Sequence, residues 1–362
     1  MVKKVLSLII LELLLLTITF SMFNLEAATV SGTIYIRADG GIDPPTASIQ
    51  RDGNLYTFTK NIYEPIVIEK SNIILDGGGY TLQGLGNGTG IYLYSGTNVT
   101  IQNINIMNFD YGIRFEWSSG NVIRDNNITC KFDGVRLSSS LNNTLFQNII
   151  ANNGYQGLFI SHSSFNIILE NSITNNTGDG IWLSSADNNN VSSNTIANNG
   201  NYGIWLHTSS NNTVFSNNIA NNKEDGIQIA FSSNNNIIQA NNLTENNYGI
   251  RIFDSSNNKI YHNNFINNVN QAFVEAGYSN IWDNGYPSGG NYWSDYEERY
   301  PDANELDGSG IWDTPYVINE NNQDNYPLIP EFPSSTTVVL LVFLTALSVV
   351  LAKRKAKNKS TT

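Results

Sequence analysis

The chain has 362 residues and a net charge of −12, and only 14% of its residues are Asp, Glu, Lys or Arg. This balance excludes a protein that binds nucleic acid through its phosphates, because such a protein needs a basic surface. A single cysteine, Cys130, excludes an internal disulfide. Stability must therefore come from repetition, packing or bound ions.

The N-terminus has the pattern of an export signal. Lys3 and Lys4 precede an apolar run over residues 5–20, and the small residues Ala27 and Ala28 follow. A basic start, an apolar centre and small residues at the end are typical of secretory signal peptides. We predict a signal peptide over residues 1–28, with an uncleaved signal anchor as the alternative.

A short motif recurs through the middle of the chain: a glycine, an apolar residue, a variable residue and a second apolar residue. The spacings are 22 or 23 residues, and the glycines are Gly90, Gly112, Gly134, Gly157, Gly180, Gly203, Gly226 and Gly249. Each repeat holds three short β-prone runs separated by Asn, Ser and Gly. Leucine-rich repeats have a similar length, but their leucine ladder and helical half are missing here.

Three strands in every repeat predict an all-β fold, a single-stranded, right-handed parallel β-helix of about eight to ten coils. Coils in such a fold stack about 4.8 Å apart, so equivalent residues form columns. The column of Ile181, Ile204 and Ile227 is expected to fill the interior. We expect a structural ladder, not a ligand site, from one column of asparagines: Asn126, Asn148, Asn171, Asn194, Asn217, Asn241 and Asn263.

The repeats have two kinds of flank. We predict an N-terminal cap over residues 29–70, repeats over 71–277 and an aromatic and acidic C-terminal cap over 278–329. A linker follows at 330–336, then an apolar transmembrane segment at 337–352 and a basic tail at 353–362. The positive-inside rule places the tail in the cytoplasm. These features predict an exported protein anchored at the cell surface by its C-terminal membrane segment.

Several segments resemble one family. They are GTIYIRADG at residues 32–40, NIILDGGGYTL at 72–82, GGNYWSDY at 289–296 and DTPY at 313–316. Together with the coils, they resemble the NosD-like, carbohydrate-binding and sugar-hydrolase class of right-handed β-helix proteins, common on archaeal surfaces. The resemblance covers nearly all of residues 30–330 and implies a pectin-lyase-like architecture. PEFP at residues 330–333 resembles a PEF-type C-terminal sorting signal, which implies cleavage by a sortase-like enzyme.

The best functional feature is the column one place after the inward isoleucines. Alternation along a strand turns its side chains outward. Aromatic faces stack on sugar rings, and arginines pair with uronate or sulfate groups. We therefore predict a surface or extracellular glycan as the partner, bound by Arg114, Arg136, Phe159, Trp182, Trp205, Gln228 and Arg251. The alternative is that a loop covers this strip or that stacked aromatics only stabilise the sheet.

The sequence indicates catalysis less strongly than binding. Asp179 and Asp225 each precede a repeat glycine, and His207 lies between them in the chain. Two coils separate the aspartates, about 9.6 Å at the stacking distance, which is at the outer edge for an inverting carboxylate pair. The simpler interpretation is that an aspartate before glycine is a turn residue. A polysaccharide lyase or glycoside hydrolase using these three residues is the second hypothesis, and a structural envelope or adhesin protein is the third.

Two groups of residues bear on whether the protein binds a metal. The resemblance to NosD suggests copper, but three His, one Cys and three Met form no cluster at ligand spacing, so copper is not expected. Asp302, Asn304 and Asp307 resemble the oxygen-rich start of a Ca²⁺ loop. A structural Ca²⁺ and a plain hydrogen-bonded turn remain alternatives there.

Asn-x-Ser/Thr sequons are dense in the repeats. Since these residues are expected outside the cell, exposed ones are candidate glycosylation sites. They are Asn87, Asn98, Asn127, Asn142, Asn175, Asn190, Asn211 and Asn242.

Overall fold

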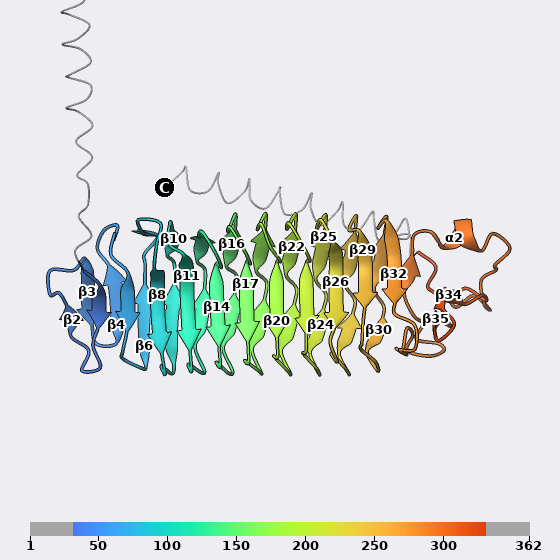
Figure 1. Ribbon diagram of the computed structural model, residues 1–362, viewed down its shortest axis with the longest axis horizontal. Coiled ribbons are helices and arrows are strands. Elements are labelled where there is room, and N and C mark those ends of the chain that lie inside the picture. Colours follow the sequence, from blue (N-terminus) through green and yellow to red (C-terminus); the bar gives the residue numbers. More distant parts are fainter. Residues whose placement is uncertain (1–31, 331–362) are drawn as a thin grey trace, which may run out of the picture. The chain divides into compact units, whose positions relative to one another are not determined.

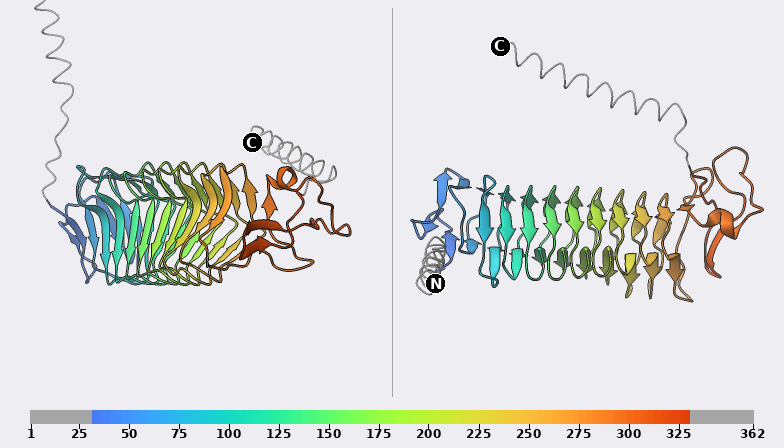
Figure 2. Two further views of the ribbon diagram at one scale, coloured as in Figure 1. Left: turned by 45° about the vertical axis from the view of Figure 1, so that its right-hand side comes forward. Right: turned by 90° about the horizontal axis from the view of Figure 1, so that it is seen from above.

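A computed structural model describes residues 32–330 and shows an all-β, right-handed parallel β-helix of about ten turns. The predicted fold class is confirmed. The chain divides into two compact units, one of residues up to 167 with 171–177, the other of 168–170 with residues from 178 onward. Within each unit the strands follow one another coil upon coil and form three sheets, here called A, B and C (Figures 1 and 2).

The first unit begins with antiparallel pairs and continues with parallel coils. Sheet A contains β1 (Ile34–Ile36), β2 (Ile42–Asp43), β5 (Ile66–Ile68), β8 (Thr89–Tyr94), β11 (Tyr111–Glu116), β14 (Val135–Ser138) and β17 (Leu158–Ser161). Sheet B contains β3 (Ile49–Asp52), β4 (Leu55–Phe58), β6 (Ile73–Asp76), β9 (Val99–Gln102), β12 (Val122–Arg124) and β15 (Thr144–Phe146). Sheet C contains β7 (Thr81–Gln83), β10 (Asn105–Met107), β13 (Asn127–Thr129), β16 (Ile149–Ala151) and β19 (Ser172–Thr174), while β18 (Ile167–Leu169) lies at the division between the units.

The second unit repeats the same three sheets. Sheet A contains β20 (Ile181–Ser184), β23 (Ile204–His207), β26 (Asp225–Ala230), β29 (Tyr248–Ile252) and β32 (Asn270–Val274). Sheet B contains β21 (Asn190–Ser192), β24 (Thr213–Phe215), β27 (Ile237–Gln239) and β30 (Lys259–Tyr261). Sheet C contains β22 (Thr195–Ala197), β25 (Asn218–Ala220), β28 (Asn242–Thr244), β31 (Asn264–Ile266) and β33 (Tyr292–Trp293), and α2 (Tyr296–Arg299), β34 (Tyr316–Asn319) and β35 (Asn322–Asp324) follow.

The repeat glycine is explained by close approach of neighbouring coils. A Cβ at Gly203 would lie 2.6 Å from both the Gly226 carbonyl oxygen and an Ile219 side-chain carbon. No side chain fits there. The residue after each glycine also faces the interior, and Ile204 and Ile227 are fully buried in register. Apolar columns therefore fill the core as predicted.

The asparagine ladder is confirmed in each unit. Asn217 shows the pattern, because its amide nitrogen donates to Asn241 Oδ1 (2.9 Å) and to the Val191 carbonyl (2.8 Å). Its own Oδ1 accepts from Asn194 Nδ2 at 3.0 Å. The sequence predicted one ladder, but two more corners carry one, as Asn121–Asn143 and Asn222–Asn246 illustrate.

The two ends of the β-helix differ from the repeating coils. At the start, the hairpin β3–β4 is antiparallel, but β5 already pairs in parallel with β1 and β8. The coils thus begin before residue 71. At the other end, Trp293 lies between the rings of Phe265 (4.2 Å) and Tyr316 (4.0 Å). The ladder ends on the buried Asp324 carboxylate, which accepts from Asn291 N and Trp293 Nε1.

We predict that Asn217→Ala lowers the free energy of unfolding by about 1–3 kcal/mol, because it removes the buried hydrogen bonds that the Asn217 side chain makes with Asn194, Asn241 and the Val191 carbonyl. Urea unfolding followed by circular dichroism measures the loss. The control is Asn218→Ala, since Asn218 is the next residue of β25 and is exposed. An equal loss in both variants would contradict a stabilising role for the ladder.

Candidate functional site

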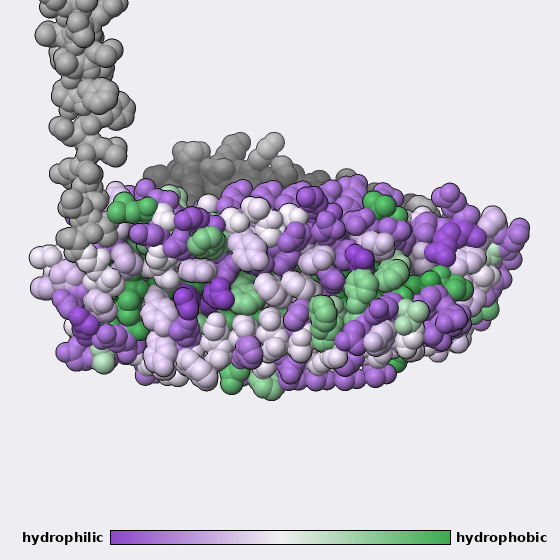
Figure 3. All heavy atoms as spheres, viewed as in Figure 1, coloured by the Kyte–Doolittle hydropathy of each residue, from purple (hydrophilic) through white to green (hydrophobic). Residues whose placement is uncertain are grey.

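The outward face of sheet A carries the column predicted from the sequence. In the second unit, Trp182, Trp205, Gln228 and Arg251 pair in register on successive strands. In the first unit, Arg114, Arg136 and Phe159 do the same. All are half-buried except Gln228, which is 8% exposed. In the view of Figure 3, apolar side chains lie among hydrophilic ones over these strands.

The two tryptophans of this column pack against each other. The rings of Trp182 and Trp205 stack on each other, with centroids 4.6 Å apart and planes 14° apart. This stacking covers one face of each ring. His207 packs edge-on against Trp205 at 5.1 Å and reaches Phe231 at 4.7 Å. Phe231 is 54% exposed, so the open aromatic surface lies there.

The residue before the repeat glycine also lies on this outward face. A Cβ on Gly226 would point at Leu243 of sheet C, so Gly226 and Ile227 both face the interior. Asp225 and Gln228 consequently lie together on the outward side of β26. The interpretation of Asp225 as a turn residue is wrong, because it is the first residue of that strand. The sequence prediction assumed that side chains alternate strictly between the two faces of a strand. It therefore missed that two consecutive residues, Gly226 and Ile227, both face the interior.

Asp225 is fully buried, and neither carboxylate oxygen has a hydrogen-bond partner among the described residues. Burial raises the pKa of this carboxyl to about 7, against the attraction of Arg251. Asp133 occupies the equivalent place in the first unit, but Arg136, three residues later, pairs with it at 3.2 Å. Burial raises the pKa of Asp133 to about 6. In the second unit, Gln228 replaces that arginine.

Around Asp225 the second unit concentrates buried polar atoms without partners. Within residues 32–330, Trp205 Nε1, Gln228 Oε1 and Arg251 Nε each lack a hydrogen-bond partner. Such atoms are rare in folded proteins, and each requires an explanation. The cluster includes donors and acceptors, so a molecule that both donates and accepts hydrogen bonds could satisfy it. The guanidinium of Arg251 is held by the rings of Tyr248 (4.9 Å) and Phe253 (4.6 Å).

The three candidate catalytic residues are only partly brought together. Asp179 is buried, and its Oδ1 accepts a hydrogen bond from the Tyr202 backbone at 3.2 Å. Burial raises the pKa of the Tyr202 hydroxyl, and the charges of Asp225 and Asp179 raise it further. Tyr202, which the sequence reasoning missed, therefore lies between the two carboxylates. His207 packs among aromatic rings, and its Nδ1 lies 3.2 Å from Thr208 Oγ1.

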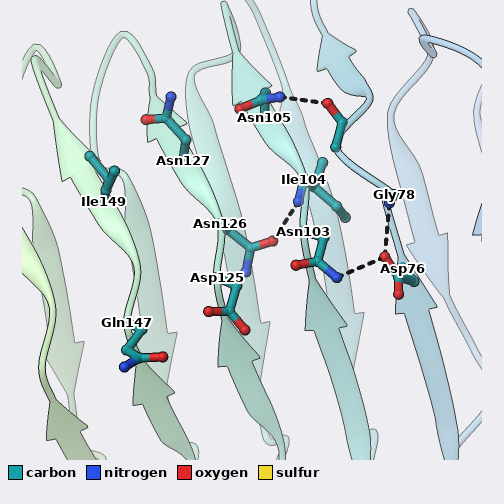
Figure 4. Close-up of a pocket in the computed structure, with 11 residues that line it drawn as sticks. Asp76, Gly78, Asn103, Ile104, Asn105, Asp125, Asn126, Asn127, Gln147 and Ile149 are labelled. Atoms are coloured by element: carbon teal, nitrogen blue, oxygen red, sulfur yellow. Dashed lines mark hydrogen bonds between the residues drawn. The ribbon is translucent and has the colours of Figure 1, made fainter. Parts of the chain in front are cut away.

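A polar groove of about 570 Å³ runs along a corner of the first unit, away from sheet A. Two rows of side chains line it: Asn103, Asp125 and Gln147 in one, and Asn105, Asn127 and Ile149 in the other (Figure 4). Burial raises the pKa of Asp76, but hydrogen bonds from Gly78, Gln102 and Asn103 hold it below its usual value. Since Asp76 is already satisfied by the protein, the groove offers little unmet polar capacity.

The predicted calcium residues lie in the C-terminal cap. The Asn304 side chain donates to the Asp302 carbonyl at 3.1 Å, and the Asp307 carboxylate accepts from the Tyr286 hydroxyl at 3.0 Å. In the part of the chain that the structure describes, no three His, Cys, Asp or Glu side chains lie close enough to hold a metal. Calcium binding at these residues stays a prediction.

The sequon asparagines share one structural property: every one of them is exposed. Their glycosylation is not tested by the fold and remains a prediction. The predicted signal peptide, the apolar segment at 337–352 and the basic tail lie outside the described residues. None of the helices found between residues 32 and 330 has the length and apolarity that a membrane span requires.

The fold and its repeat define a right-handed parallel β-helix protein. The family model described as periplasmic copper-binding protein (NosD) matches residues 80–225, and the model of the right-handed β-helix region matches residues 166–285. A search of curated proteins gave no match.

Two solved structures are similar in fold. A variant of the periplasmic alginate epimerase AlgG is 17% identical, with a TM-score of 0.51, over 62% of this chain and 67% of that chain. The ORF18 protein of Geobacillus virus E2 is 15% identical, with a TM-score of 0.52, over 76% of this chain and 62% of that chain. At such identities the likeness shows the fold alone.

The described residues do not fit the copper that the NosD description implies. Cys130 is buried in the core, and burial raises its thiol pKa to about 12, so it is not a thiolate ligand. Nδ1 of His162 lies 2.8 Å from Ser161 Oγ, and Nε2 of His262 lies 2.8 Å from the Ser288 carbonyl. His207 is enclosed by aromatic rings. The three histidines thus lie in different environments and form no joint site.

We predict that Asp225→Asn stabilises the protein at pH 8 and changes little at pH 4. An unfolded aspartate has a pKa near 3.9, and the folded value is about 7. The free energy of unfolding of the unsubstituted protein therefore falls as the pH rises between these two pKa values. Above pH 7 the total loss is about 4 kcal/mol. The melting temperature of the variant, relative to the unsubstituted protein at each pH, measures the effect.

The control for this prediction is Asp52→Asn, because Asp52 is exposed and lies outside the predicted calcium residues. It should shift the melting temperature equally at both pH values. Destabilisation by Asp225→Asn at pH 8 would show instead that the ionised carboxylate has a stabilising partner.

Proposed function

We propose that this chain is an exported β-helix protein that binds a polysaccharide on the outward face of sheet A in its second unit. The observation that carries the proposal is the cluster of buried polar atoms without partners on Trp205, Asp225, Gln228 and Arg251. A polar ligand that reaches these atoms removes a desolvation cost that the free protein bears. The same residues adjoin an exposed aromatic surface at His207 and Phe231.

Carbohydrate fits this cluster better than other ligand classes. Every sugar hydroxyl both donates and accepts, which matches acceptors on Asp225 and Gln228 and donors on Trp205 and Arg251. The apolar face of a sugar ring packs on an aromatic side chain such as Phe231. The periplasmic alginate epimerase with a similar fold is named for a polysaccharide, which is consistent with the proposal but does not carry it.

Acid–base catalysis on the bound polysaccharide is the second candidate function. A carboxyl with a pKa of about 7 is suited to exchange protons near neutral pH, and Asp225 has such a pKa. Tyr202 lies beside it and is a second group that could exchange a proton. A lyase or hydrolase would use these residues, with Asp179 or His207 in supporting positions.

Export rests on the sequence of the N-terminus and on the periplasmic description of the matching family model. Anchoring by residues 337–352, processing after the PEFP motif by a sortase-like enzyme and an archaeal cell surface are further parts of this proposal. Each of them rests on the sequence alone.

The first test is a glycan array probed with the purified full-length chain. We predict that Trp205→Ala and Arg251→Gln each lower the affinity for the best glycan at least tenfold, because each removes a donor from the cluster. The matched control is Phe215→Ala, since Phe215 is an exposed aromatic residue on sheet B of the same unit. Circular dichroism confirms that each variant is folded.

Incubation with each bound glycan, followed by analysis of the products, separates the two candidate functions. Binding without product formation supports a binding protein, and product formation that Asp225→Asn abolishes supports catalysis. Full binding by Trp205→Ala, or no binding to any glycan, would contradict the proposed site and favour a structural role in the envelope.

A further inference from the structure

A separate pocket lies on the outward face of sheet A in the first unit. It has a volume of about 360 Å³, and its walls come from three successive coils. Its lining residues are Tyr111, Phe132, Asp133, Arg136, Gly154 and Tyr155. This volume is at the small end of the range for ligand pockets. It suits a single sugar ring and not a long chain.

The aromatic walls of this pocket do not stack face to face on one another, although Lys131 Nζ lies 5.2 Å from the centroid of the Phe132 ring. Tyr111 and Phe132 have ring centroids 5.8 Å apart and planes 44° apart, so neither ring covers the face of the other. Phe132 is 40% exposed and Tyr155 is 49% exposed. Their backbones are neighbours, because Tyr155 N donates to the Phe132 carbonyl at 3.2 Å. Open faces beside a polar group are what a pyranose ring requires.

A fixed polar pair provides the hydrogen-bonding part of the pocket. Asp133 is 2% exposed and accepts from Arg136 Nη1 at 3.2 Å. The Arg136 guanidinium also lies 4.6 Å from the ring centroid of Phe159 and 5.6 Å from that of Tyr111. These contacts orient the guanidinium before a ligand arrives. A guanidinium carries five N–H donors, so those not used on Asp133 remain for sugar hydroxyls.

The charges around the pocket determine what kind of sugar fits. Each nearby cation already has a carboxylate partner: Arg136 with Asp133, Lys131 with Asp110 at 3.5 Å, and Arg114 with Glu116. No positive charge is in excess, so a uronate or sulfate would gain little net attraction there and would still lose the hydration of its charge. The sequence-based expectation that these arginines pair with acidic sugars therefore does not suit this pocket.

We infer that the pocket between Phe132, Tyr155 and the Asp133–Arg136 pair binds one neutral pyranose ring, by stacking on the aromatic walls and by hydrogen bonds to vicinal hydroxyls. The inference takes only its ligand class, carbohydrate, from the proposed function. It names a second site, on different coils from the Trp205–Asp225 cluster.

The test uses the full-length chain and a panel of methyl pyranosides, neutral hexosides against methyl glucuronide, with affinities measured by NMR titration. We expect a neutral hexoside to bind and the glucuronide to bind at least fivefold more weakly. Phe132→Ala and Arg136→Gln should each lower the affinity for the neutral hexoside at least fivefold. Phe165→Ala is the matched control, because Phe165 is an exposed phenylalanine of the same unit outside the pocket.

Trp205→Ala separates this inference from the proposed function. It should abolish polysaccharide capture and leave the hexoside titration unchanged, whereas Phe132→Ala should do the reverse. If no neutral hexoside binds, if the glucuronide binds more tightly, or if Phe132→Ala titrates like the unsubstituted protein, the inference is overturned. None of these results affects the polysaccharide assay, which tests the site of the second unit independently.

Discussion

The coils of this protein turn over columns of buried asparagine and serine side chains, and the register of the coils depends on the hydrogen bonds of those side chains. Asn217 accepts from the asparagine of the coil before it and donates to the asparagine of the coil after it. A shift by one residue would turn the buried asparagines and the interior isoleucines of a coil toward the opposite face. The ladders thus keep equivalent residues of each unit aligned.

This alignment places the side chains of successive coils next to one another in a column, so that together they form one surface. Residues 22–24 positions apart become neighbours, as Trp205, Gln228 and Arg251 show. One substitution in one repeat therefore changes the environment of residues in the adjoining coils. Asp133 and Asp225 illustrate this effect: the first has an arginine three residues later, whereas the second has Gln228 and is left buried without an ion pair.

The two units consequently present different surfaces from one repeat pattern. In the first, ion pairs neutralise the cations, and Phe132 and Tyr155 stay open around a small pocket. In the second, the rings of Trp182 and Trp205 stack on each other. Buried polar atoms of Asp225, Gln228 and Arg251 lack hydrogen-bond partners among the described residues. A buried carboxyl with a pKa of about 7 costs stability at neutral pH, which points to a use other than folding.

The sequence by itself determined the architecture, because a strict 22- or 23-residue period with three β-prone runs has few other solutions. It also located the buried asparagine ladder and the outward column from Arg114 to Arg251, since both follow from stacking equal repeats. Only the tertiary structure placed Asp225 beside Gln228, because the reversal at Gly226 depends on how closely neighbouring coils approach. Ring stacking at Trp182 and Trp205 and the pocket at Phe132 were likewise decided by side-chain packing between coils, which a period does not encode.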